Sequence, residues 1–201
     1  MRIIKIQSKE DAIPSNYTDE IKENTISANP NDEFLKAVQK VRGKSGFLNK
    51  DQYYYSSPED FLIQHGKHYI SQSLTKEELD YLKKIYYETK RYKMKQCFYN
   101  AQSLSQFSGD KIKYVEGYLY SGIIPIEHAW NTLNSKVLDF TMYHANGGKP
   151  ILGIIPDGWD YFGVNLPTEM ITKYWAKHGK SDALIGNWME GYPLLKEKFK
   201  I

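Results

Sequence analysis

The chain has a single cysteine, Cys97, and lacks any long apolar run. One cysteine excludes an intramolecular disulfide, so we expect a reducing compartment and a cytoplasmic protein. Residues 1–7 are too few and too charged to form a signal peptide. No apolar stretch approaches the roughly 18 residues that a membrane helix needs, so we expect no membrane association.

The sequence also has little net charge. Its 27 basic and 24 acidic residues leave a formal charge of +3, which requires no nucleic-acid partner. The densest lysine run, between residues 83 and 95, falls on a predicted helix and the loop after it, and a solvated helix face explains it. The 17 tyrosines lie mostly in amphipathic patterns, which favour core packing over base stacking. We therefore expect no nucleic-acid partner.

Two further absences concern cofactors and metals. No glycine-rich loop follows a predicted strand, so the sequence has no phosphate-binding pattern for a nucleotide cofactor. His65 and His68 have a spacing seen among metal ligands, but no acidic residue or cysteine completes a pattern around them. We interpret them as surface histidines at a helix end. The sequence therefore predicts neither a cofactor nor a metal.

Length and composition are those of one globular domain. With 201 residues, 41% of them hydrophobic and 25% charged, the chain is long enough for a single compact domain with a sizeable core. Residues 1–56 are expected to form an N-terminal extension, with a helix over 31–43 that packs on the core. Residues 57–201 are expected to form the main α+β domain.

Helix-start signals, and a change in the spacing of apolar residues from a helical period to a period of two, divide this main domain into elements. Ser57 followed by Pro58 predicts a helix toward Gly66, and a capping box from Thr75 to Glu78 predicts a second helix. The remaining elements are a helix that opens at Cys97 and ends near 107, strands over 111–118, 126–130 and 137–141, a strand over 150–155, an aromatic segment at 159–164, and a helix that Thr168 caps and Gly179 ends.

His128 and Asp139 lie on two successive predicted strands. If the hairpin is tight and its turn is centred between residues 133 and 134, the two side chains face each other across neighbouring strands. Their Cβ atoms would then lie about 5 Å apart. The pattern therefore predicts that the Asp139 carboxylate accepts a hydrogen bond from the His128 ring.

Cys97, His128 and Asp139 together have the chemistry of an activated nucleophile. A thiol needs a base to become a thiolate near neutral pH, and the base needs an acceptor that fixes its ring. A helix N-terminus favours the thiolate, and the Cys97 backbone N–H exposed there is a natural donor to an oxyanion. We interpret Cys97 as the nucleophile, His128 as the general base and acid, and Asp139 as the orienting acid.

Other residues are candidates for smaller roles. Gln96 either points at the substrate or oxyanion or fixes the turn before the helix. Gln52, Tyr53 and Tyr54 are candidates for a second oxyanion donor. His144 is a rival histidine, but it follows the acid and lacks the neighbours of His128.

Four motifs in residues 93–145 share their order and flanks with a known group. They are Gln96-Cys97-Phe98 at a helix start, the strand that ends in Gly117-Tyr118, His128-Ala129-Trp130, and the strand Val137-Leu138-Asp139-Phe140-Thr141. This set resembles the transglutaminase-like branch of the papain-like cysteine protease superfamily. The resemblance implies a papain-like or transglutaminase-like core, in which the Cys-bearing helix packs on an antiparallel sheet that carries the His and the Asp.

The resemblance also implies an activity. The gaps between the three residues are short, no calcium-loop pattern is present, and the N-terminal half is not the large accessory domain of animal transglutaminases. We therefore expect a compact hydrolase or acyltransferase that acts on an amide or peptide bond through a thioester, with hydrolysis slightly favoured. The substrate is expected to be a protein or peptide, or a small amide or acyl donor. The alternative is a non-catalytic binding or inhibitor protein on the same scaffold.

Overall fold

The structure is a computed structural model that describes residues 47–89, 93–122 and 124–199. The helix expected over 31–43 and most of the expected N-terminal extension lie outside the described residues. The described end of that extension packs against the C-terminal segment, because the N–H groups of Tyr54 and Tyr55 both donate to the Leu195 carbonyl.

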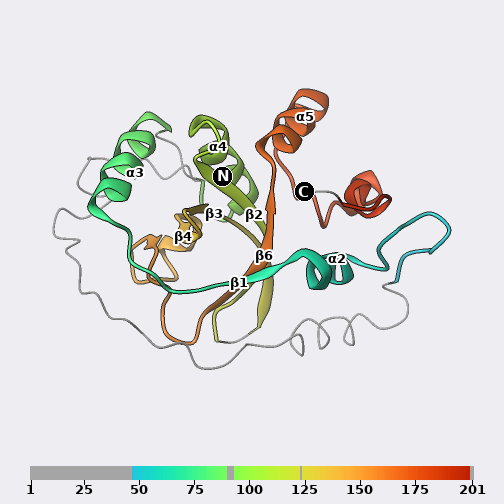
Figure 1. Cartoon of the computed structure of the whole chain (residues 1–201), viewed down its shortest axis with the longest axis horizontal. Helices are drawn as coiled ribbons and strands as arrows, with labels where there is room; N and C mark the ends of the chain where they lie inside the picture. The colour runs from blue at the N-terminus through green and yellow to red at the C-terminus, as the bar shows by residue number, and fades with distance from the viewer. Residues whose placement is uncertain (1–46, 90–92, 123, 200–201) are drawn as a thin grey trace.

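The described residues form an α+β fold, as the sequence predicts, with helices packed on a curled antiparallel sheet (Figure 1). The helices are α2 (Pro58–His65), α3 (Lys76–Thr89), α4 (Cys97–Phe107) and α5 (Thr168–His178), and the strands are β1 (Lys67–Tyr69), β2 (Ile112–Tyr120), β3 (Pro125–Leu133), β4 (Lys136–Asp139), β5 (Ile151–Leu152) and β6 (Asp160–Leu166). The strand order is β1-β6-β2-β3-β4-β5. Helix α4 lies between α3 and α5 in Figure 1 and packs against β2 and β3.

Two of the expected helix starts are confirmed. The Ser57 hydroxyl accepts the Asp60 N–H at 3.1 Å. Thr75 and Glu78 form the expected capping box, since the Glu78 N–H donates to the Thr75 hydroxyl and the Thr75 N–H donates to the Glu78 carboxylate. These caps depend only on neighbouring residues, which is why the sequence predicts them well.

The expected cap of α5 is wrong. Thr168 is the first residue of the helix, and Pro167 occupies the cap position without a side-chain hydrogen bond. The Thr168 hydroxyl instead contacts the Ser105 hydroxyl of α4 at 3.0 Å, so a tertiary partner has replaced the local one. The other end is confirmed, because Gly179 ends the helix in the left-handed conformation at φ 65°.

The aromatic segment at 159–164 forms most of β6, which lies between β1 and β2 in the sheet. Both faces of this strand are buried. Phe162 and Val164 pack in one apolar cluster with Ala101 of α4, whereas Tyr161 packs in another with Trp130 of β3. Because both faces are apolar, apolar and polar residues do not alternate regularly along the strand.

Strands β2 and β6 approach unusually closely at a pair of opposed glycines, Gly117 and Gly163. A Cβ on Gly117 would lie 2.0 Å from the Phe162 carbonyl oxygen and 2.5 Å from the Gly163 Cα. Gly117 is also opposite His128 on its other side. A glycine inside a strand often marks this kind of backbone approach, and here it sets the position of β3 relative to β6.

Gly117→Ala is therefore expected to destabilise the fold by about 1–3 kcal/mol or more, because the new methyl group meets rigid backbone. Urea unfolding followed by circular dichroism measures the change. Gly186→Ala is the matched control, since its methyl group would meet the tip of the Glu127 side chain, at 3.3 Å. Equal stability of the two variants would contradict the close approach.

The hairpin between β3 and β4 differs in register from the expected one. Thr132 is opposite Val137 and Leu133 is opposite Lys136, which places the turn at Asn134-Ser135. Both turn residues have positive φ, 50° and 68°, as a two-residue hairpin turn requires. The expected direct pairing of 128 with 139 is therefore wrong by two positions, so His128 lies diagonal to Asp139.

Strand β4 is also shorter than expected. It ends at Asp139, and Thr141 begins a 3₁₀ turn (Thr141–Tyr143) instead of continuing the strand face. The Asp139 carboxylate causes this change of direction, because it accepts the N–H groups of Thr141 and Met142 at 2.8 and 3.2 Å. The strand expected over 150–155 is likewise limited to Ile151–Leu152.

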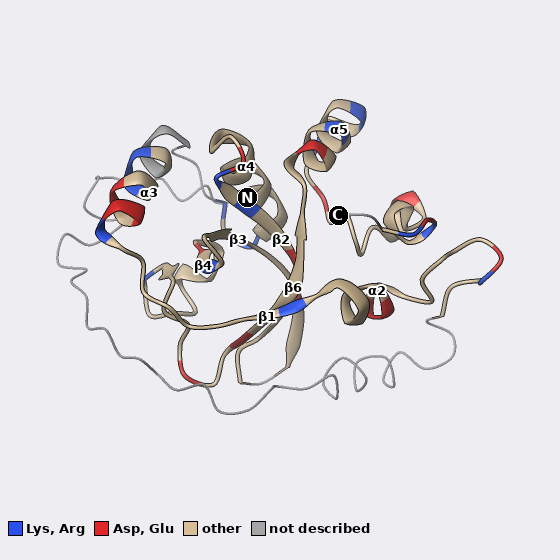
Figure 2. Ribbon diagram, viewed as in Figure 1, with Lys and Arg blue, Asp and Glu red and all other residues tan. Residues whose placement is uncertain are grey.

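Charged residues of both signs occur on α3 and α5, whereas β2 and β3 are mostly uncharged (Figure 2). On α3, Lys83 and Lys84 share the helix with Glu77, Glu78 and Asp80. This mixture is typical of a solvated helix face. Among the described residues, no helix combines the length and the apolar character needed to cross a membrane.

Candidate functional site

Cys97 is the first residue of α4, and its side chain is half-buried. Lys95 has a positive φ of 60° and Gln96 precedes the helix in a non-helical conformation, so the chain turns sharply into Cys97. The first turn of α4 holds no acidic residue. The backbone N–H groups at this end have no partner within the helix, so they carry the positive end of the helix dipole.

His128 lies on β3 and only 3% of its side chain is exposed. Among the residues that the structure describes, β4 pairs with β3 only at residues 131–133, and no strand pairs with the segment around His128 on that side. The Trp130 ring stacks parallel to the imidazole, with centroids 6.2 Å apart. The ring is therefore held by packing against Trp130 and by its polar contacts.

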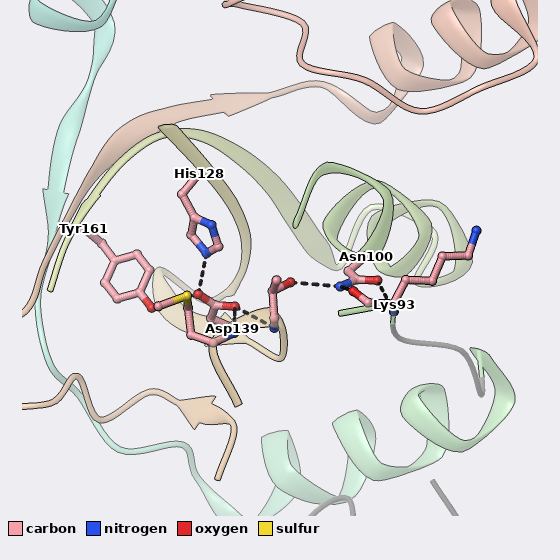
Figure 3. A network of polar contacts seen from close by, with 7 residues as sticks. Lys93, Asn100, His128, Asp139 and Tyr161 are labelled. Carbon is pink, nitrogen blue, oxygen red and sulfur yellow. Dashed lines mark hydrogen bonds and ion pairs between the residues drawn. The ribbon is translucent and has the colours of Figure 1, made fainter. Parts of the chain in front are cut away.

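The expected contact between His128 and Asp139 is present. His128 Nε2 lies 2.6 Å from Asp139 Oδ2, with both side chains buried. The shifted register preserves this contact because a slip of two residues keeps a side chain on the same face of the sheet. Asp139 also accepts the Tyr161 hydroxyl at 2.9 Å (Figure 3).

The Asp139 carboxylate therefore has four partners. Its Oδ1 atom accepts the N–H groups of Thr141 and Met142, and its Oδ2 atom contacts His128 Nε2 and accepts the Tyr161 O–H. Such a set of hydrogen bonds fixes the position of the carboxylate. With Oδ2 of Asp139 as the acceptor, Nε2 of His128 is the donor and carries a proton.

The electrostatics of His128 follow from this arrangement. Burial alone lowers the pKa of the imidazole, but the charge and hydrogen bond of Asp139, together with a hydrogen bond and charge from Cys97, raise the pKa of His128 to about 10. Cys97 thus lies close enough to the ring that Asp139 holds to affect the pKa of that ring. Because Nε2 is taken by Asp139, Nδ1 is the nitrogen left for Cys97.

Asn100 joins the Cys97 helix to the Asp139 turn (Figure 3). Its side chain accepts the Lys93 N–H at 2.8 Å and donates to the Lys93 carbonyl at 2.9 Å and to the Thr141 hydroxyl at 3.0 Å. The segment before α4 and the turn after β4 are therefore fixed by one buried amide. This clamp sets the position of the Cys97 backbone relative to Asp139.

A small hollow lies beside His128. Its volume is about 20 Å³, enough for about one water molecule. It is lined by Pro58, Leu62, Phe98, Glu116, Gly117, Tyr118, Glu127, His128, Ala183, Ile185 and Gly186. Most of its wall is apolar, and the polar side chains in the lining are Glu116, Glu127, His128 and Tyr118.

Glu116 holds one wall of this hollow in place. Its carboxyl oxygens accept the N–H groups of Leu184 and Ile185 at 2.7 and 2.8 Å, and also the Tyr114 hydroxyl. Burial raises the pKa of Glu116 to about 7. The nearby Glu127 charge also raises this pKa, whereas the three hydrogen bonds to the carboxyl group lower it. The wall at 184–185 thus depends on a carboxyl group that titrates near neutral pH.

The raised pKa values of Glu116 and His128 predict how stability depends on pH. Each group binds its proton more tightly in the folded state, so its contribution is lost as pH rises, from 4.5 to about 7 for Glu116 and from 6.5 to about 10 for His128. We expect the melting temperature to fall steadily between pH 6 and pH 10. His128→Gln should flatten the alkaline part of this fall, whereas His178→Gln on α5 should not. A melting temperature that rises over this range would contradict the assignment.

The other residues that the sequence singles out either have described contacts outside the site formed by Cys97, His128 and Asp139, or have roles that stay predictions. The Gln96 side chain does not cap α4, and its role toward an oxyanion or substrate stays a prediction. The Tyr53 hydroxyl donates to the Gly191 carbonyl and Tyr54 is bound to Leu195, and no described contact joins either to Cys97. His68 lies on β1 and pairs with Asp160 at 3.1 Å.

Sequence reasoning missed Tyr161 and Asn100. Asn100 follows Cys97 by three residues, so helical spacing places it near the same face, but nothing local identifies its partners. Tyr161 comes from a distant strand and had no signal of its own. In the part of the chain that the structure describes, no group of three or more His, Cys, Asp or Glu side chains has the arrangement of a metal site.

The site is thus a buried His–Asp pair with a cysteine at a helix N-terminus beside it. Comparison of the chain with protein-family models, with curated proteins and with solved structures finds no match.

Proposed function

We propose that the chain is a cysteine-dependent acyl-transfer enzyme of the transglutaminase-like, papain-like type. Cys97 is the nucleophile, His128 the general base and acid, and Asp139 the acceptor that orients the ring. The observation that carries this proposal is the buried 2.6 Å contact between His128 and Asp139, with Cys97 beside the same ring at the start of α4. A histidine with only a structural role in the core would not require a neighbouring cysteine, and a structural cysteine would not require a neighbouring His–Asp pair.

The chemistry follows from the position of each proton. His128 Nδ1 takes the thiol proton, and the Cys97 sulfur attacks the carbonyl carbon of an amide, which becomes a tetrahedral oxyanion. The backbone N–H of Cys97 at the helix N-terminus donates to this oxyanion. The C–N bond then breaks, His128 gives its proton to the departing amine, and the acyl group remains on sulfur as a thioester.

The second half reverses these roles. His128 removes a proton from water or from a primary amine, which attacks the thioester carbonyl. The C–S bond breaks, and Cys97 leaves as the thiol with the proton returned from His128. Water gives a carboxylic acid, and an amine gives a new amide. We favour water, because the hollow that His128 lines has room for about one water molecule.

The proposed substrate is a protein or peptide, or a small amide or acyl donor, and no cofactor is invoked. A thiolate nucleophile requires reducing conditions, which is consistent with the proposed cytoplasmic location.

Iodoacetamide labelling tests the proposal without a known substrate. We expect Cys97 to be alkylated at pH 7 at least tenfold faster than glutathione, because a paired thiolate reacts and a thiol does not. His128→Gln should remove this difference, and His178→Gln, on α5, should keep it. Labelling of the native protein no faster than glutathione would favour the binding or inhibitor protein instead.

A further inference from the structure

Tyr161 is a buried titratable residue in direct contact with the site, and the proposed mechanism gives it no role. It lies on β6, with no exposed surface, and its hydroxyl donates to Asp139 Oδ2 at 2.9 Å. Its ring also packs edge-on against Trp130, with centroids 5.1 Å apart, and lies 6.4 Å from the His128 ring. The side chain is therefore fixed by packing, and its polar contact among the described residues is with Asp139.

The two oxygens of Asp139 are divided between different tasks. Oδ1 accepts two backbone N–H groups, which tie the carboxylate to its own turn. Oδ2 is the oxygen in contact with His128, and Tyr161 donates to this same atom (Figure 3). Two donors on one oxygen share its negative charge, so each interaction with that atom is weaker than it would be alone.

We propose that Tyr161 is a positioning residue that acts through Asp139. Its hydroxyl fixes the Oδ2 atom in the plane of the His128 ring and takes part of the charge that the imidazole would otherwise receive. This inference rests on the proposed function. In that mechanism His128 must give its Nδ1 proton to the leaving amine, and a carboxylate without a second donor on Oδ2 would make the ring more basic and disfavour this transfer.

Several titratable groups face the Asp139–His128 pair, and each bears on its pH dependence. They are Cys97 on α4, Tyr161 on β6, and Glu116 and Glu127, which line the hollow beside His128 from β2 and β3. Burial and the Asp139 charge raise the pKa of Tyr161, so its hydroxyl stays a neutral donor across the working range. Tyr161 is thus a constant partner of Oδ2 while the other groups titrate.

Tyr161→Phe tests the inference, since it removes the hydroxyl and keeps the ring. We expect the alkaline limb of the Cys97 alkylation rate, plotted against pH, to move upward by about one pH unit. The midpoint of the His128 ring resonances in an NMR titration should move in the same direction. Turnover of p-nitrophenyl acetate should fall roughly ten- to hundredfold, because the Oδ2 atom that orients His128 loses one of its two partners.

Tyr69→Phe is the matched control. Tyr69 is also buried, lies opposite Tyr161 in the β1–β6 pair and packs on Trp130, but its hydroxyl donates to Asn165. It should leave both pH midpoints unchanged. Equal midpoints in native protein and Tyr161→Phe, with circular dichroism showing a folded chain, would overturn the inference.

The two proposals fail in different ways. Slow alkylation of the native protein overturns the proposed function, whereas fast alkylation with an unmoved His128 midpoint in Tyr161→Phe overturns the role of Tyr161 alone. The NMR titration reports on Tyr161 even in a Cys97→Ala background, because it needs no reaction.

Discussion

Replacement of Asp139 by asparagine is expected to leave the chain folded and to lower turnover by roughly 10²- to 10⁴-fold. All four partners of Asp139 stand as donors to its carboxylate, whereas asparagine has one acceptor oxygen and one NH₂ group. The amide oxygen suits the backbone N–H groups of Thr141 and Met142, because these cannot become acceptors. The NH₂ group then faces His128 Nε2.

That orientation has a specific consequence for the ring. Nε2 must become the acceptor, so the ring proton moves to Nδ1, the nitrogen left for Cys97, and the imidazole can no longer accept the thiol proton. Hydrolysis of p-nitrophenyl acetate measures the loss, because this activated ester needs little recognition. Asp160→Asn is the matched control, since Asp160 pairs with His68 at a more exposed position on the same sheet. Full turnover in Asp139→Asn would mean that another acceptor orients His128.

Replacement of Cys97 by alanine has the largest expected effect. Turnover should fall to the uncatalysed background, because no other described thiol is present and the thioester cannot form. The free energy of unfolding should change by less than about 1 kcal/mol, since a half-buried side chain loses one sulfur atom. Urea unfolding and ester hydrolysis on the same preparation separate the two quantities.

Cys97→Ser extends this test, because the hydroxyl keeps the shape of the side chain but is a far weaker nucleophile beside an imidazole tuned for a thiol. It should be as inactive as Cys97→Ala. If the biological activity of the protein survives either change, the chain works by binding and the catalytic proposal fails.

Local signals explain which parts of the fold the sequence could predict. The caps at Ser57 and Thr75 and the start of α4 depend on residues within one helical turn, and all three are where the pattern places them. The β3–β4 turn was misplaced because Asn134-Ser135 lacks the glycine that marks most two-residue turns. The sequence predicts only an aromatic segment at 159–164, where the structure has strand β6. Because both faces of this strand are buried, its sequence lacks the alternation of apolar and polar residues that indicates a strand.

In the candidate site, too, the contacts between neighbouring elements could be predicted and those that depend on tertiary packing could not. The contact between His128 and Asp139 could be predicted because the two lie on adjacent strands, and the error of two residues in register did not change the face. The contacts of Asn100 with Thr141 and of Tyr161 with Asp139 join residues 41 and 22 positions apart and depend on tertiary packing. Nothing in one sequence specifies such partners.

The place of β6 in the sheet also orders the events of folding. Strands β2, β3, β4 and β5 are neighbours in both sequence and space, so they can pair as soon as they are made. Strand β1 is made earlier, but in the described sheet it is bonded to β6 alone and must wait for a strand about ninety residues later. Tyr161 reaches Asp139 only at that step. A nascent chain therefore carries the Cys97 thiol through synthesis before Tyr161 is in place, and closure of the sheet and the Tyr161–Asp139 contact are one event.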